Sequence, residues 1–128
     1  MPILYSFASL DSEHKLAIII AMLSILPFEI IFDNAVAMHF TAIDHRDHSP
    51  ILDAIEQQLR YEAITKTRDR KPLRIPNLLD ATWELRCGWH NRYRVFYDVD
   101  IENRFVIVLA VGHKLGNRLV IGNEEFEL

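Results

Sequence analysis

Three charged residues with the chemistry to hold an anion lie on two neighbouring predicted strands. Glu84 and Arg86 alternate with other residues in the stretch Trp83 to Cys87, so their side chains share one face of that strand. Arg94 lies in the next stretch, Arg92 to Asp100, and can sit beside them, because cross-strand partners on one face are only about 5 Å apart. The fixed fork of donors on a guanidinium group can bridge two phosphate oxygens. The spacing therefore predicts a charged sheet face.

The same charges could instead serve the sheet itself. Arg86 and Arg94 could pair across the strands with acidic neighbours, which are Glu84 and Asp98. Such pairing would stabilise the sheet by about 0.2–1 kcal/mol per pair. Both interpretations require the same strand pairing.

A three-stranded meander is predicted to position these residues. Trp83 to Cys87, Arg92 to Asp100 and Phe105 to Val111 are each rich in β-branched or aromatic residues, and turn formers separate them. Apolar and charged positions alternate in the middle strand, which leaves one face to pack and the other to carry charge. The residues of the packing face are Tyr93, Val95, Tyr97 and Val99. A short final strand is expected around Leu119 to Ile121.

Two helices are predicted ahead of the meander, on its apolar face. Phe28 to Phe32 has the composition of a short strand, and Asp33 or Asn34 can cap a helix that follows it. Ser49 and Pro50 open a second helix. The residues that recur there at helical spacing, and that should meet the packing face of the meander, are Ile51, Leu52, Ile55 and Leu59. The charged face of the sheet should stay free.

Neither a disulfide nor a metal site is indicated. Cys87 is the single cysteine, so no internal disulfide or cysteine-based zinc site can form, and a reducing cytoplasm fits best. A free cysteine on a strand is expected to be a small buried hydrophobe. Two histidines lie with two aspartates in the turn Asp44 to His48, but no further ligand follows at a recognised spacing. This favours a solvated turn.

The charge of the chain is unevenly distributed. The 128 residues and 50% hydrophobic content suit one core, and the net charge of −4 argues weakly against a polyanionic partner. From Lys66 to Arg118, however, eleven basic residues stand against six acidic ones, a local excess of five positive charges. The stretch Ala63 to Ala81 should be an exposed connection. Its basic residues, which either contact phosphate or form an ordinary solvated charge run, are Arg68, Arg70, Lys71 and Arg74.

Residues 1–26 are an N-terminal extension ahead of the domain, residues 27–128. Leu16 to Phe28 is an apolar run of 13 residues, shorter than the 18 or so that a bilayer-spanning helix needs, so no membrane anchor is expected. A secretory signal is disfavoured, because acidic residues precede the run. The extension is either an added helix that covers an apolar surface or the result of a reading frame whose translation starts at Met22.

Three motifs carry a resemblance to a known family. They are ELR at Glu84 to Arg86, RYRVFYDVD at Arg92 to Asp100 and VGHKLGNRL at Val111 to Leu119. With the order strand, helix, helix and then three or four strands, the chain resembles the RelE/ParE superfamily of bacterial toxin–antitoxin modules from Pro27 to about Leu119. The resemblance implies an α+β fold with two N-terminal helices packed on a small antiparallel sheet. It also implies a cytoplasmic toxin that an antitoxin from a neighbouring gene holds inactive.

The activity that the resemblance implies is metal-free and cofactor-free cleavage of mRNA in the ribosomal A site. The ribose 2′-hydroxyl attacks the adjacent phosphate, which requires a base, a cation on the phosphorane and an acid. By motif, Arg94 is the expected transition-state clamp, His113 the acid and Glu84 a possible base. Residues expected to bind RNA are Arg86, Lys114, Arg118, Arg70, Lys71 and Arg74.

The chain also departs from the family pattern. Thr82 and Glu84 stand where RelE-type members place lysines, and no tyrosine follows Tyr97. A ParE-like gyrase poison and a catalytically inactive antitoxin-binding module are therefore alternatives to the endoribonuclease.

Overall fold

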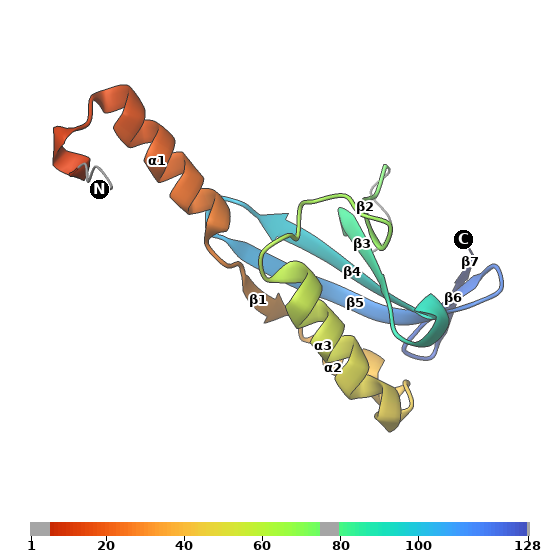
Figure 1. Cartoon of the computed structure of the whole chain (residues 1–128). Helices are drawn as coiled ribbons and strands as arrows, with labels where there is room; N and C mark the ends of the chain where they lie inside the picture. The colour runs from red at the N-terminus through yellow and green to blue at the C-terminus, as the bar shows by residue number, and fades with distance from the viewer. Residues whose placement is uncertain (1–5, 75–79, 128) are drawn as a thin grey trace.

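One sheet runs through the described residues, 6–74 and 80–127, of the computed structural model (Figure 1). Its seven strands are β1 (Glu29–Phe32), β2 (Arg70–Pro72), β3 (Trp83–Cys87), β4 (Tyr93–Asp100), β5 (Phe105–Leu115), β6 (Arg118–Ile121) and β7 (Glu124–Glu127). The α-helices are α1 (Ser12–Ile25), α2 (Ala35–Thr41) and α3 (His48–Leu59). The predicted α+β class is confirmed, but the sheet is larger than expected.

The meander at the centre of the sheet has the predicted strands. β3, β4 and β5 pair antiparallel in that order, and Arg86 lies opposite Arg94. β5 continues past its predicted end at Val111, because its last residues pair with β6. β6 is the short strand expected around Leu119 to Ile121.

β1 is an exception to the prediction of one antiparallel sheet. It pairs in parallel with the first residues of β5, where Glu29 lies opposite Phe105. A parallel pair requires a long connection, and the chain between β1 and β5 is long enough because it contains α2, α3 and three strands. The expectation of purely antiparallel pairing is therefore wrong for this strand.

Two edge strands were not predicted. β2 adds three residues to the outer side of β3, within the stretch expected to be a loop, and its Pro72 suits an edge because an edge strand can lose a donor. β7 comes from the acidic tail and pairs with β6. Both strands are short and polar, so neither shows the β-branched composition on which strand prediction rests.

α3 covers one face of the sheet, as predicted. Its residues Ile51, Ile55 and Leu59 are at most 1% exposed, and they form one cluster with buried β4 residues. Those β4 residues are Tyr93, Val95 and Tyr97. Burial of each aliphatic side chain contributes about 1.5–3 kcal/mol. The prediction fails only for Leu52, which is 43% exposed.

The opposite face of the sheet is partly covered, which corrects the expectation that it stays free. Phe96 is 4% exposed and clusters with Leu119 and Ile121 from β6. Gly112 makes this approach possible, because a Cβ there would lie 2.6 Å from the carbonyl oxygen of Val120. The apolar side chains of the β6–β7 hairpin thus cover one end of the charged face.

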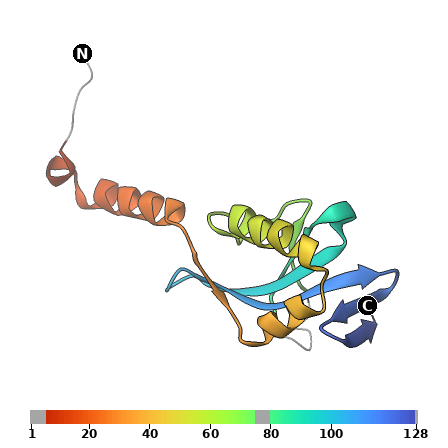
Figure 2. The same cartoon turned by 90° about the horizontal axis from the view of Figure 1, so that it is seen from below.

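α1 projects away from the rest of the chain (Figures 1 and 2). Its apolar side chains are exposed, among them Ile20 at 58% and Ile25 at 71%. In the part of the chain that the structure describes, α1 therefore covers no apolar surface of its own domain, and both interpretations of the extension stay predictions. Among the described residues, no helix has both the length and the hydropathy to cross a membrane.

Candidate functional site

Glu84 is the centre of a cluster of charges on the sheet face opposite α3. Its Oε1 lies 3.1 Å from Nε of Arg94, and its Oε2 lies 3.4 Å from Nζ of Lys71. The side chains of Glu84 and Arg94 are only 12% and 9% exposed. Since a cation engages each carboxylate oxygen, Glu84 is arranged to hold these two cations in place rather than to accept a proton.

Backbone carbonyls also fix the Arg94 side chain. Its Nη1 donates to the carbonyl oxygen of Tyr93 at 3.1 Å and to that of Asn91. Asn91 ends the turn between β3 and β4 with a left-handed φ of 51°, which asparagine tolerates better than most residues. Burial lowers the pKa of Arg94, while the charge of Glu84 acts against that shift. The guanidinium group is pre-organised by these contacts.

Arg86 completes the cluster on the side that water reaches. It lies opposite Arg94 in the strand pairing, is partly exposed, and its charge also lowers the pKa of Arg94. Lys71 and Arg94 thus pair with the carboxylate of Glu84, and Arg86 adds a third positive charge on the same face beside Arg94. We call these four residues the Glu84 cluster. The predicted grouping of Glu84, Arg86 and Arg94 is confirmed, but Arg94 is far less open than expected.

His113 does not join this cluster. It lies opposite Tyr93 in the β4–β5 pairing, whereas Arg94 lies opposite Gly112, so the two side chains point to opposite faces. The rings of His113 and Tyr93 have centroids 6.3 Å apart. The prediction that His113 acts on the same phosphate as Arg94 and Glu84 therefore lacks the geometry that it requires.

The environment of His113 leads to a pH prediction. Burial lowers the pKa of His113 below its usual value, and the positive charge of Arg92 lowers it further. The folded chain therefore binds fewer protons than the unfolded chain as the pH falls through the usual histidine range. We expect the free energy of unfolding to decline between about pH 7 and pH 5. In His113→Gln the decline should be smaller, measured by urea denaturation across that range, and identical slopes would contradict this.

An interaction that the sequence did not reveal links Tyr93 to the start of α3. The Tyr93 hydroxyl donates to Oδ2 of Asp47 at 2.6 Å, and burial with this bond raises the pKa of Tyr93 to about 12. In the same turn, Asp44 accepts from the backbone N–H of Arg46. The alternation of β4 predicts the face of Tyr93, but nothing local to Asp47 indicates its distant partner.

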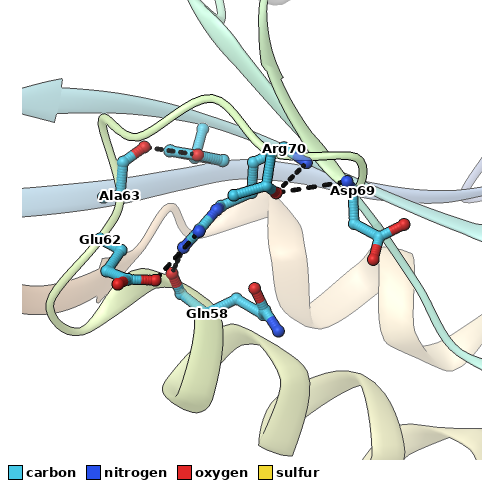
Figure 3. Close-up of polar contacts among 7 residues, drawn as sticks. Gln58, Glu62, Ala63, Asp69 and Arg70 are labelled. Atoms are coloured by element: carbon cyan, nitrogen blue, oxygen red, sulfur yellow. Dashed lines mark hydrogen bonds and ion pairs between the residues drawn. The ribbon is translucent and has the colours of Figure 1, made fainter.

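Arg70 is a structural residue, contrary to the prediction that it binds RNA. Its side chain is 2% exposed and lies under the end of α3, where Nη2 is 3.1 Å from Oε2 of Glu62 and Nη1 donates to the Gln58 carbonyl (Figure 3). The strand β2 turns this side chain inward, because Arg70 pairs with the buried Leu85. The next residue, Lys71, then points to the opposite face and reaches Glu84.

Removal of Arg70 should destabilise the chain. In Arg70→Met the Gln58 carbonyl loses its donor, which costs about 1–3 kcal/mol for a buried group. Arg68→Met, an exposed position two residues earlier, should change the free energy of unfolding by less than about 0.5 kcal/mol. Chemical denaturation of both variants tests this, and equal stabilities would contradict the structural role.

The other basic residues predicted to bind RNA are dispersed. Lys114 is exposed on β5 and, two positions from Gly112, shares the face of Arg94. Arg118 is exposed and pairs with Glu125 at 3.3 Å. Arg74 is exposed beyond β2. Of these three residues, only Lys114 is placed to extend the Glu84 cluster.

Comparison with known proteins identifies the fold. No protein-family model matches the chain, and no curated protein matches it at a significant level. Among solved structures, one chain of the toxin–antitoxin complex RelBE2 from Mycobacterium tuberculosis is 27% identical, with a TM-score of 0.50. The chain has a RelE-like fold. The match covers 70% of this chain and 100% of the RelBE2 chain, so the RelE-like unit leaves part of the present chain outside it.

Proposed function

We propose that this RelE-like chain is the toxin of a toxin–antitoxin module and inhibits translation by cleaving mRNA on the ribosome. The match to a chain of the RelBE2 toxin–antitoxin complex supports the toxin role and an antitoxin partner from a neighbouring gene. Such a toxin works in the cytoplasm, where its ribosome and mRNA partners are.

The Glu84 cluster is the observation that carries the nuclease proposal. When a 2′-hydroxyl attacks the neighbouring phosphate, a bond from O2′ to phosphorus forms, the bond from phosphorus to the 5′-oxygen of the next nucleotide breaks, and the hydroxyl proton passes through solvent to that oxygen. Negative charge develops on the phosphorane oxygens during this step. Guanidinium donors fixed in advance stabilise that charge at no reorganisation cost. Arg86 would contact the phosphate from the exposed side of the cluster. Arg94, which Glu84 holds in place on the buried side of the cluster, would add its positive charge. Lys71, 47% exposed on its side chain, adds a further positive charge.

The division of labour differs from the one expected from the motifs. Glu84 positions Arg94 and Lys71, and His113 lies on the other face of the sheet. Charge stabilisation by arginine, often the largest catalytic contribution, is then the main contribution of this chain. It requires neither a metal nor a cofactor.

A ParE-like gyrase poison is the second candidate. The Arg94 side chain is 9% exposed, and His113 lies on the opposite face of the sheet from the Glu84 cluster. A protein that poisons an enzyme by binding it needs no acid–base set. An inactive module that only binds the antitoxin would share this arrangement.

Induced expression in bacteria separates these roles. We expect the chain to stop growth and amino-acid incorporation within minutes, and co-expression of the neighbouring gene to restore both. Growth arrest with DNA breakage and intact mRNA would favour the gyrase poison. No effect on growth in the absence of an antitoxin would contradict the toxin role.

A further inference from the structure

α1 has apolar side chains on all sides. Every described side chain from Leu16 to Leu26 is exposed, including Leu16 at 58%, Met22 at 59% and Leu23 at 50%. A helix that is apolar all round is normally buried. A monomer rarely exposes so much contiguous apolar surface unless a partner covers it.

The connection after α1 keeps this helix away from its own domain. The Arg104 guanidinium lies 3.9 Å above the Phe28 ring and donates to the Leu26 carbonyl. The Phe28 N–H donates to the Arg60 carbonyl at 2.6 Å. Leu26 has an extended backbone and ends the helix, these contacts fix the residues that follow, and α1 points away from α2 and α3 (Figures 1 and 2).

The domain has an apolar surface of its own that α1 does not reach. A hollow of about 390 Å³ opens between β1, α2 and α3, and Phe32, Val36, Phe40 and Leu52 line it. Phe32 and Leu52 are 42% and 43% exposed at this hollow. We call it the β1–α2–α3 hollow.

We propose that α1 docks into the β1–α2–α3 hollow of a second copy of this chain, so that two copies exchange α1 and form a symmetric dimer. One chain carries both the apolar helix and the apolar hollow, and the two lie apart within one copy (Figures 1 and 2). A two-fold exchange covers both surfaces in both copies and leaves no open end.

A lipid surface suits α1 less well than a second copy. α1 spans about 21 Å at 1.5 Å per residue, which is shorter than the hydrocarbon core of a bilayer. Helices that lie on a membrane have a basic polar face opposite the apolar one. Apart from His14, the charged residues of α1 are Glu13 and Lys15, both in its first turn. This proposal does not depend on the nuclease activity.

The mass of the purified full chain in solution is the first test. By sedimentation at micromolar concentration, we expect a dimer. Ile20→Glu in α1 and Leu52→Glu in the hollow should each give monomers, since both positions are exposed in a single copy and tolerate a charge there. Ile101→Glu, an equally exposed apolar position in the β4–β5 turn, should remain dimeric. A monomeric parent chain would overturn the proposal.

A disulfide test establishes which surfaces meet. Cys87 is buried, so any disulfide that forms between two copies should involve the added cysteines. Leu23→Cys and Leu52→Cys proteins should form a disulfide-linked dimer when mixed and not when separate. Linkage of Leu23→Cys to itself would show pairing between two α1 helices and would overturn the exchange. A monomer that sediments with vesicles of phosphatidylcholine and phosphatidylglycerol would also overturn the exchange.

Discussion

Arg86→Ala is expected to slow mRNA cleavage by about 10²–10³-fold while the fold stays intact, since loss of one fixed donor to a developing oxyanion has an effect of that size. Arg86 is partly exposed, so its removal should disturb the fold less than removal of a buried arginine. Arg86→Lys should recover only part of the rate, because an ammonium group keeps the charge but loses the planar fork. The rate is measured in a translation extract, and urea denaturation verifies the fold.

Arg46→Ala is the matched control for this prediction. Arg46 has a side chain 82% exposed in the turn before α3, and its loss should leave the cleavage rate unchanged. Arg94→Ala is less informative than Arg86→Ala, because Arg94 is buried. Its loss would leave the Glu84 carboxylate without its guanidinium partner as well as remove a donor to the phosphate. Full activity of Arg86→Ala would remove this residue from the proposed site.

Glu84→Gln should lower the free energy of unfolding by about 3 kcal/mol. Glu84 neutralises a guanidinium group that is 9% exposed, and an uncompensated buried charge costs about 3–5 kcal/mol. A loss of 3 kcal/mol in a domain of this size should lower the melting temperature by about 10 °C. Calorimetry or circular dichroism on heating measures the change.

A second ion pair in the same chain provides the control. Glu125 pairs with Arg118, and their side chains are 59% and 65% exposed, so Glu125→Gln should cost less than about 1 kcal/mol. The double variant Glu84→Leu, Arg94→Leu should be more stable than Glu84→Gln, because it also removes the buried charge that Glu84 neutralises. If Glu84→Gln and Glu125→Gln melted at the same temperature, the Glu84 cluster would not be effectively desolvated.

The central strands could be predicted from the sequence because their alternation is strong. Tyr93, Val95 and Tyr97 face α3 as the pattern required, and Arg94 faces the other side. The same alternation places His113 with Tyr93, so the separation of His113 from Arg94 follows from the register once β5 is known to continue past Val111. The motif alone suggested a grouping that the register does not allow.

The burial of Arg70 and Arg94 could not be predicted from the sequence, because it depends on contacts between distant segments. Arg70 looked like part of a solvated basic run, but β2 pairs with β3 and turns its side chain under α3. The burial of Arg94 arises partly from Glu84 and partly from carbonyls of the β3–β4 turn. No local pattern reports such neighbours, since charge and hydropathy are the same for a buried and an exposed arginine.

Mapping the 5′ ends of an mRNA in a reconstituted translation reaction tests the nuclease proposal most directly. After addition of the purified chain, we expect new 5′ ends inside the translated reading frame, present only when ribosomes are translating. The Arg86→Ala protein should give few or none of these ends. An mRNA that stays intact with the parent chain, under conditions in which the chain stops bacterial growth, would contradict the nuclease proposal.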